Sequence, residues 1–340
     1  MTDPTQNHQS PRPPASLNAR QRRWRMSAVA GYLLLVATVP ACSGGPGNTG
    51  AQATQPSSDL ILGIAPKSVE PCSLVDASPL SSYGWSPPYN EMGDYAACFV
   101  DIYPPSGGWI RGTVEFRDRF GPNDQLSGVI EDHGDIRVSR EPPSPGDCRR
   151  TILLPERTPV IVDAMAHGNV QVDMCIVAET MTKTALAKLA SSGLGTRPLG
   201  PPNSLVNIDM CSLPSPDNLN AAGFDPAAAS PGYGRWYCSW RTAAGATLQV
   251  SAFRQDPRPE GGTQIVLTGH DTVVLPGDQV GLPNGCVAKI TNRRFLTSDG
   301  AQRIERIAIS YTGLGPETPD ALCRMATTFA GGVAARLPSG

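Results

Sequence analysis

The sequence predicts an α+β protein with two tandem homologous domains, each an antiparallel sheet covered by a C-terminal helix and stapled by two disulfides. Three observations support this prediction. The chain has 340 residues, which is enough for about two domains of ordinary size. Of its nine cysteines, eight fall into two sets of four with similar spacing. Its 35 glycines and 34 prolines favour strands joined by many turns over a bundle of helices.

The N-terminus has the pattern of an export signal. Arginines cluster within residues 20–25, and an apolar run covers residues 28–39. This run is shorter than the ~20 residues that a membrane-spanning helix needs, and it is typical of a signal-peptide core. It ends in Val39-Pro40-Ala41-Cys42, which resembles the bacterial lipoprotein signal, in which the cysteine is diacylated and becomes the mature N-terminus.

This resemblance implies a lipoprotein in which Cys42 carries the acyl chains, palmitate among them. An uncleaved signal anchor is the alternative. Both place the rest of the chain on the extracytoplasmic face of the cell membrane, so the plasma membrane is the expected partner. Residues 43–60 are rich in Gly, Ser, Thr and Gln, and they predict a flexible tether.

The eight remaining cysteines indicate an internal duplication. The gaps between them are 26, 50 and 27 residues in the first set and 27, 48 and 37 in the second. The flanking residues agree as well, because Cys72-Ser73-Leu74 matches Cys211-Ser212-Leu213, and an alanine lies three residues after each fourth cysteine. Agreement at several fixed offsets predicts two copies of one structural unit. The two sets are Cys72, Cys98, Cys148 and Cys175, then Cys211, Cys238, Cys286 and Cys323.

The duplication divides the chain into five segments. The predicted boundaries are 1–41 for a disordered n-region plus signal peptide, 42–60 for the tether, 61–195 for the first domain, 196–206 for a Pro- and Gly-rich linker, and 207–340 for the second domain.

Within each domain, local patterns predict strands in the middle and a helix at the end. Short β-branched or alternating segments predict strands at 112–116, 158–162, 248–253, 264–267 and 306–311. Apolar residues three and four positions apart predict an amphipathic helix near each fourth cysteine, where one apolar face must lie on the sheet. These stripes are Ala178, Met181, Ala185 and Leu189 in the first helix and Leu322, Met325, Phe329, Val333 and Leu337 in the second. Asp173 and Thr318 are the expected N-terminal caps.

Four cysteines allow three connectivities, and the sequence does not choose between them. We favour the adjacent pairing, because each bond then ties one helix to one strand. The favoured pairs are Cys72–Cys98, Cys148–Cys175, Cys211–Cys238 and Cys286–Cys323.

The cysteine motifs resemble a large family of uncharacterised actinobacterial lipoproteins, common in mycobacteria and nocardiae. The similarity rests on Pro71-Cys72-x-Leu74, on Cys238-Ser239-Trp240 and on Cys323-x-x-Ala326, and it covers residues 70–338. Members usually carry one such domain, whereas this chain carries two. Cys98-Phe99-Val100 departs from the pattern because it lacks the tryptophan. The resemblance implies a compact α+β domain, of the kind also seen in extracytoplasmic sensor and lipid-handling modules, and no known activity.

The sequence contains no recognisable motif for catalysis, for a cofactor or for a metal. Gly-x-Ser-x-Gly, Ser-x-x-Lys and a phosphate-binding glycine loop after a strand are absent. His133 and His270 lie between predicted strands, where a polar turn is a simpler interpretation than a metal site. Two arginine pairs, at 149–150 and 293–294, either face anionic lipid or polysaccharide or, more simply, end strands in solvent.

These features predict a ligand- or protein-binding module of the cell envelope and not an enzyme. A lipid, a glycan or another envelope protein is the expected ligand or partner. The net charge of −2 gives no reason to expect nucleic acid. An envelope hydrolase with an unrecognised site and a structural spacer are the alternatives.

Overall fold

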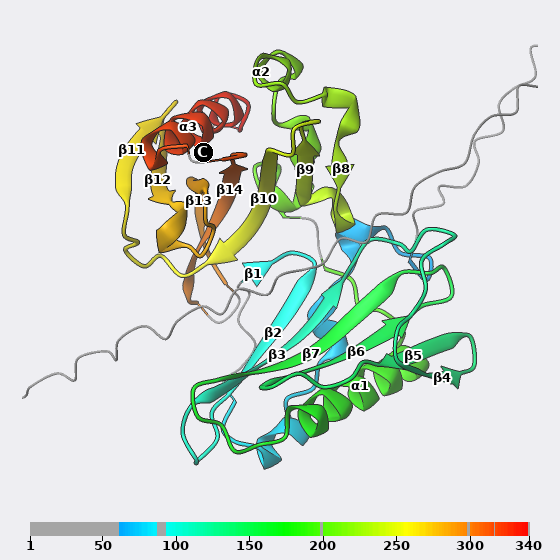
Figure 1. Ribbon diagram of the computed structural model, residues 1–340. Helices are drawn as coiled ribbons and strands as arrows, with labels where there is room; N and C mark the ends of the chain where they lie inside the picture. The colour runs from blue at the N-terminus through cyan, green and yellow to red at the C-terminus, as the bar shows by residue number, and fades with distance from the viewer. Residues whose placement is uncertain (1–60, 87–92, 198–199, 298–299, 316, 339–340) are drawn as a thin grey trace, which may run out of the picture. The chain divides into compact units, whose positions relative to one another are not determined.

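Two antiparallel sheets, one in each half of the chain, carry most of the structure (Figure 1). The computed structural model describes residues 61–86, 93–197, 200–297, 300–315 and 317–338. Helices pack on both sheets, so the predicted α+β class is confirmed. Cys42, the predicted signal peptide and the predicted tether lie outside the described residues. No helix in the described part of the chain is long and apolar enough to span a membrane.

The first sheet has six strands in the order β2-β3-β7-β6-β5-β4, and it is followed by one long helix. Three short 3₁₀ helices and a two-residue strand precede it. The bounds are η1 Pro66–Ser68, η2 Pro71–Leu74, η3 Pro79–Ser82, β1 Gly93–Asp94, β2 Ala97–Ile102, β3 Trp109–Phe116, β4 Val129–His133, β5 Ile136–Arg140, β6 Asp147–Leu153, β7 Pro159–His167 and α1 Met174–Ser191.

The second sheet has eight strands, of which seven follow the order β11-β12-β13-β14-β10-β9-β8 and the eighth, β1, pairs with β10. The bounds are η4 Leu205–Asn207, η5 Met210–Ser212, α2 Pro216–Ala221, η6 Pro226–Ala228, β8 Ser230–Pro231, η7 Tyr233–Arg235, β9 Tyr237–Arg241, β10 Thr247–Gln255, β11 Thr263–Leu267, β12 His270–Pro276, η8 Gly277–Gln279, β13 Gly285–Leu296, β14 Gln302–Thr312 and α3 Pro319–Ala334.

The two halves connect their strands in the same way. Read from the opposite end, the second sheet runs β9-β10-β14-β13-β12-β11, which matches β2-β3-β7-β6-β5-β4 strand for strand. In both halves a hairpin is followed by a connection to the far edge of the sheet, and the chain then returns toward the middle. A final helix follows the sixth of these strands in each half. The two sheets therefore have similar architectures.

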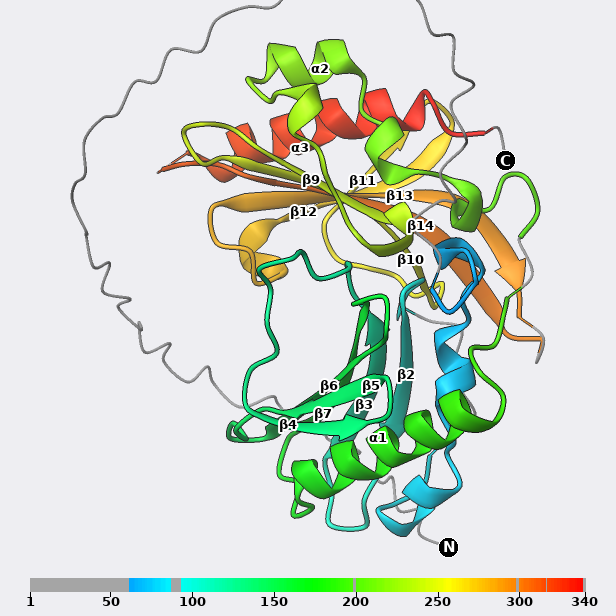
Figure 2. The ribbon, with the colours of Figure 1, turned by 90° about the vertical axis from the view of Figure 1, so that its right-hand side faces the viewer.

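Each final helix lies across one face of its own sheet (Figure 2). Ala178, Met181 and Ala185 of the first predicted stripe are buried, whereas Leu189 is half-buried. Asp173 caps α1 by accepting from the Cys175 N–H, and Thr318 caps α3 by accepting from the Ala321 N–H, so both predicted caps are confirmed. In α3, Leu322, Phe329 and Val333 are buried and Met325 is half-buried, whereas Leu337 lies after the end of the helix. Each helix therefore buries the apolar face that its spacing predicts.

Four disulfides join the cysteines in the favoured pairs. Cys148–Cys175 and Cys286–Cys323 each tie a central strand to the helix above it. Cys72–Cys98 ties the 3₁₀ helix η2 to β2, and Cys211–Cys238 ties the 3₁₀ helix η5 to β9. Cys323 lies one turn inside α3, whereas Cys175 is the second residue of α1. Four such bonds indicate an oxidising compartment outside the cytoplasm.

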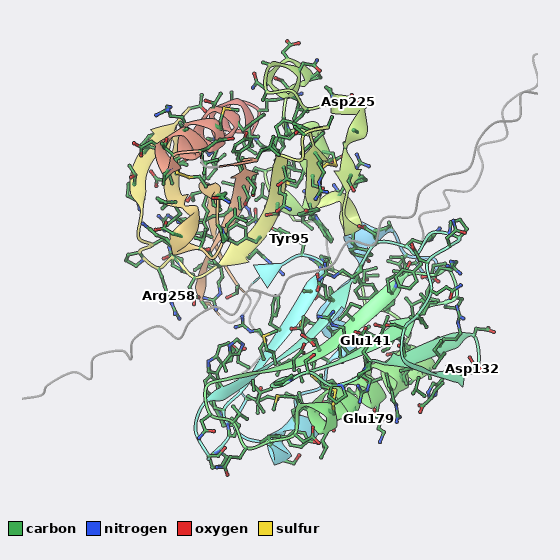
Figure 3. The ribbon with its side chains drawn as sticks, viewed as in Figure 1. Tyr95, Asp132, Glu141, Glu179, Asp225 and Arg258 are labelled. Carbon is green, nitrogen blue, oxygen red and sulfur yellow. A yellow bond between two sulfur atoms is a disulfide. The ribbon has the colours of Figure 1, made fainter. Side chains whose placement is uncertain are left out.

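The halves also share contacts, which the division into tandem domains did not predict. Gly93 of β1 pairs with Arg254 of β10, and so a segment of the first half extends the second sheet. The Tyr95 ring, labelled in Figure 3, lies 5.4 Å from the Trp236 ring and belongs to the second hydrophobic core. The predicted linker contributes Leu205 and Val206 to that core as well.

Candidate functional site

The two histidines that the sequence singles out lie at strand ends, one in each half of the chain. His133 ends β4 and is exposed, with its Nε2 atom 3.9 Å from Glu131, and Figure 3 shows the neighbouring Asp132 at the end of this hairpin. His270 begins β12, and its Nδ1 atom lies 3.1 Å from the Thr291 carbonyl oxygen. Among the described residues, no group of three or more His, Cys, Asp or Glu side chains is placed to hold a metal ion.

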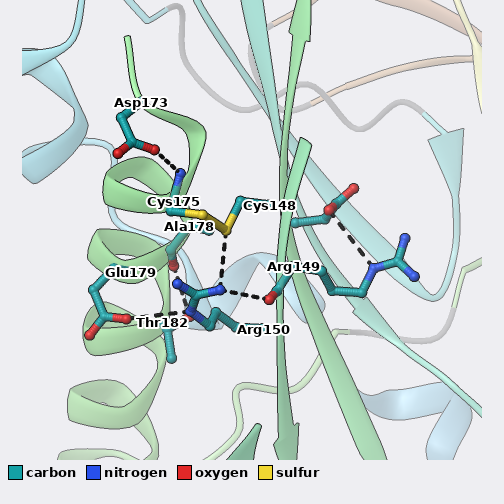
Figure 4. Close-up of a disulfide and its surroundings, with 9 residues drawn as sticks. Cys148, Arg149, Arg150, Asp173, Cys175, Ala178, Glu179 and Thr182 are labelled. Atoms are coloured by element: carbon teal, nitrogen blue, oxygen red, sulfur yellow. Dashed lines mark hydrogen bonds and ion pairs between the residues drawn. A yellow bond between two sulfur atoms is a disulfide. The ribbon is translucent and has the colours of Figure 1, made fainter. Parts of the chain in front are cut away.

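One arginine of each pair forms an ion pair with a glutamate inside the fold, whereas Arg149 and Arg294 are exposed. Arg150 is 7% exposed, donates to the Cys148 Sγ atom over 3.1 Å, and places its Nε 3.5 Å from Glu179 (Figure 4). Arg293 pairs with the buried Glu305 at 2.7 Å. The expectation of solvated strand ends is therefore wrong for Arg150, which pairs with α1, and for Arg293, which pairs with β14. Arg149 and Arg294 face solvent as that expectation has it.

The candidate site is a cavity of about 460 Å³ formed by four segments that are distant in the sequence. It combines the start of the described chain, the loop after β3, the start of β7 and the loop before β9. Its lining residues are Ile61, Ala65, Pro66, Lys67, Asp118, Arg119, Thr158, Pro231, Gly232, Tyr233, Gly234 and Arg235.

Tyr233 is the one aromatic residue among the described residues that line the cavity. Its ring stacks on Phe116 with 5.3 Å between the centroids and also lies 6.2 Å from the Trp236 ring. The phenol oxygen is buried and has no hydrogen-bond partner among the described residues. Burial raises the pKa of Tyr233 above its ordinary range, so the hydroxyl stays protonated and can donate.

The loop that carries Tyr233 has an unusual backbone. Gly234 and Arg235 have φ values of 63° and 60°, in the left-handed region that a non-glycine residue seldom adopts. A Cβ atom on Gly234 would lie 2.6 Å from the Trp236 ring, so glycine is required there. The Arg235 Nε donates to Asp209 Oδ2 over 2.6 Å and thereby holds the loop in this conformation. Strain of this kind is common at binding sites.

The rim of the cavity is rich in cations. The Lys67 ammonium donates to the carbonyl oxygens of Asn207 and Ile208, both at 3.1 Å, and one of its three donors remains for a ligand. Burial lowers the pKa of Lys67, while the Asp209 carboxylate opposes that shift. Burial has the opposite effect on a carboxyl group, and it raises the pKa of Asp118. Three cationic side chains and one carboxyl group line the cavity in total: Lys67, Arg119, Arg235 and Asp118.

The lining combines apolar side chains with a few charged groups and the Thr158 hydroxyl. The apolar floor includes Ile61, which is 2% exposed. A mostly apolar cavity with a few convergent polar groups is the usual form of a small-ligand site.

Sequence reasoning did not find this site, because no single segment contains it. Its residues come from positions 61–67, 118–119, 158 and 231–235. The one local signal is Gly232-Tyr233-Gly234-Arg235, where an aromatic residue between two glycines indicates a special turn. That signal marks the loop but not the segments that it meets.

Fold and site together define a disulfide-bonded α+β protein with two similar sheet-and-helix halves and a cavity where the halves meet. Comparison with protein-family models, curated proteins and solved structures found no match for this chain.

Proposed function

We propose that this chain is a lipid-anchored, extracytoplasmic binding protein that holds an amphipathic anion in the cavity around Tyr233. In this proposal Cys42 carries the anchor, the halves arose by duplication of one domain, and no reaction is catalysed. The four disulfides support a location outside the cytoplasm. The export signal and the lipoprotein motif at residues 39–42 support the anchor.

The observation that carries the binding function is the contrast between the floor and the rim of the cavity. Ile61, Pro66 and the Tyr233 ring offer an apolar surface, and the volume of about 460 Å³ lies in the ordinary range for small-ligand sites. At the rim, three cations and one carboxyl group line the cavity, and Asp209 pairs with one of these cations, Arg235. An apolar group attached to a carboxylate or phosphate fits both parts, because burial of the apolar group drives binding and the charge orients it.

The test is native mass spectrometry of the chain extracted gently from membranes and mixed with a long-chain carboxylate or with its uncharged methyl ester. We expect an acylated protein with eight hydrogens fewer than the reduced form, since four disulfides are present. We also expect the carboxylate to bind at least about tenfold more tightly than the ester.

Two alanine variants show whether the ligand occupies this cavity. Ala65 lines it and is exposed, so Ala65→Trp fills the space without disturbing a core. Ala228, in η6, is also exposed but lies outside the cavity, and Ala228→Trp is the matched control. Loss of binding in Ala65→Trp alone supports the proposal. Equal binding by all three proteins contradicts the site, and an unacylated mass contradicts the anchor.

A further inference from the structure

The outer strand of the second sheet, β11, has a free edge within the part of the chain that the structure describes. β11 ends the strand order of that sheet and pairs only with β12 there. Its sequence, Thr-Gln-Ile-Val-Leu, contains no charged residue, no proline and no glycine. Val266 is 67% exposed on it. Edge strands normally carry lysine, proline or a bulge, because their unpaired N–H and C=O groups otherwise bind another strand.

Strand β4 occupies the equivalent edge of the first sheet and provides a contrast. Val129 on β4 is 66% exposed, nearly the same as Val266 on β11. Unlike β11, however, β4 continues with Glu131, Asp132 and His133. Two copies of β4 placed edge to edge would bring carboxylates together, and like charges oppose cross-strand pairing. The first sheet is therefore protected at this edge by charge, and the second sheet is not.

We propose that β11 pairs antiparallel with β11 of a second copy of this chain, so that the two sheets become one continuous sheet. With the two-fold axis at Ile265, Val266 faces Gln264 of the second copy, and Thr263 faces Leu267 of the second copy. Every facing pair is uncharged. The contact uses the same surface on both molecules, so it closes as a dimer and does not propagate into a filament.

A second copy suits this edge better than a flexible peptide does. A five-residue strand forms few hydrogen bonds, and a disordered peptide would lose conformational entropy in making them. The β11 strand of another folded molecule is already extended and loses little conformational entropy when it pairs. An interface of this length lies at the small end of the range for specific contacts, so we expect a reversible dimer that depends on concentration. This inference does not depend on the cavity or on the lipid anchor.

Sedimentation velocity of the full chain tests the dimer, over a concentration series that reaches the millimolar range and in a non-ionic detergent that keeps any acyl group dispersed. We expect a monomer–dimer equilibrium for the unmodified chain. Val266→Lys should raise the dimer dissociation constant at least about tenfold, because two lysines would lie at the shared edge. Val129→Lys is the matched control and should leave that constant unchanged.

Folding is checked separately so that a disturbed monomer is not mistaken for a lost interface. Thr263 is also exposed on β11, and Thr263→Lys should weaken the dimer as Val266→Lys does, with thermal unfolding of both variants unchanged. A chain that stays monomeric throughout the series overturns the proposal. So does an equal loss of association in Val129→Lys, or open-ended assembly, since either result places the contact elsewhere.

Discussion

At the scale of single residues, the most unusual chemical group is a pair of carboxyl groups on the first sheet. Asp147 begins β6, and Asp163 lies on the adjacent strand β7. The Oδ1 atoms of both are buried and have no hydrogen-bond partner among the described residues. A proton shared between the two carboxyl groups satisfies both oxygens, whereas two carboxylates would repel each other without a donor.

The pKa of Asp163 reflects this environment. Burial is the main cause that raises it, to about 7, and the hydrogen bond and charge of Asp147 act in the same direction. Glu115 on β3 raises it further, while Arg149, whose Nε lies 3.9 Å from Asp163 Oδ1, opposes the shift. The folded protein therefore binds a proton at this position that the unfolded chain, with an aspartate pKa of about 4, releases more easily.

We expect Asp163→Asn to stabilise the protein above neutral pH and to have little effect below pH ~4. The folded-state pKa exceeds the unfolded one, so the free energy of unfolding of the unmodified protein falls as pH rises between those two values. The free energy of unfolding of Asp163→Asn does not fall in this way, because asparagine does not titrate. The difference should grow to on the order of 2 kcal/mol near pH ~7 and then stay constant, after allowance for solvent screening. Denaturant unfolding at several pH values measures it. A difference that is independent of pH would contradict the shared proton.

At the scale of elements, the disulfides can stabilise the fold in two ways, by restricting the unfolded chain and by making contacts in the native state. Cys72–Cys98 and Cys148–Cys175 close loops of nearly equal length, with separations of 26 and 27 residues. They should therefore restrict the unfolded chain by similar amounts. Only the second bond joins the long helix α1 to the sheet, and its Cys148 Sγ accepts from the buried Arg150 guanidinium. The α1–β6 disulfide thus has a native-state contact to Arg150.

Replacing both cysteines of a pair by alanine separates these contributions. The Cys72→Ala/Cys98→Ala protein should lose about 3–4 kcal/mol of unfolding free energy, which is the cost expected from loop closure. The Cys148→Ala/Cys175→Ala protein should lose about 1 kcal/mol more, because Arg150 also loses an acceptor. Urea unfolding with the two double variants side by side measures both. Equal losses would show that the contact to Arg150 contributes nothing.

At the scale of the whole molecule, a residue of the predicted linker holds the halves together. The Arg197 guanidinium donates to the carbonyl oxygens of Val69 and Tyr95, at 2.8 and 2.6 Å. It also lies 3.6 Å from the Glu70 carboxylate and 5.2 Å from the centre of the Trp236 ring. Its side chain is 7% exposed. One buried cation therefore contacts the start of the first half at Val69 and Glu70, the segment between β1 and β2 at Tyr95, and the core of the second half at Trp236.

Arg197→Ala should lower the free energy of unfolding by on the order of 3 kcal/mol, since Glu70 and two carbonyl groups lose their partner. Because the cavity is lined by both halves, the variant should also bind the long-chain carboxylate more weakly. Arg137, which is exposed on β5, is the matched control, and Arg137→Ala should change neither quantity. Calorimetric unfolding gives the first value and native mass spectrometry the second. If Arg197→Ala matches the control, Arg197 has no role in joining the halves.

Patterns along the sequence were sufficient to predict structural features that depend on residues close together in the chain. Asp173 and Thr318 were predicted as caps because a side-chain oxygen that precedes a helical stripe can accept from the first free N–H groups. Strands such as 112–116 and 306–311 follow from alternation and turn residues. Matching offsets around the two sets of cysteines indicated two similar units, and the two sheets have the same strand order. Local spacing therefore predicted the class of fold, five of the strands and the final helix of each half, and the adjacent disulfide pairs that it favoured are the ones that form.

The tertiary structure alone decided which distant residues meet. Arg150 follows a cysteine in a strand, and nothing nearby in the sequence shows that α1 will cover it and supply Glu179. Tyr95 joins the core of the second half, and Tyr233 meets residues 61–67 and 118–119, although more than a hundred positions separate them. Such contacts depend on how two complete halves pack, and packing is governed by the shape and burial of whole surfaces rather than by a periodic pattern.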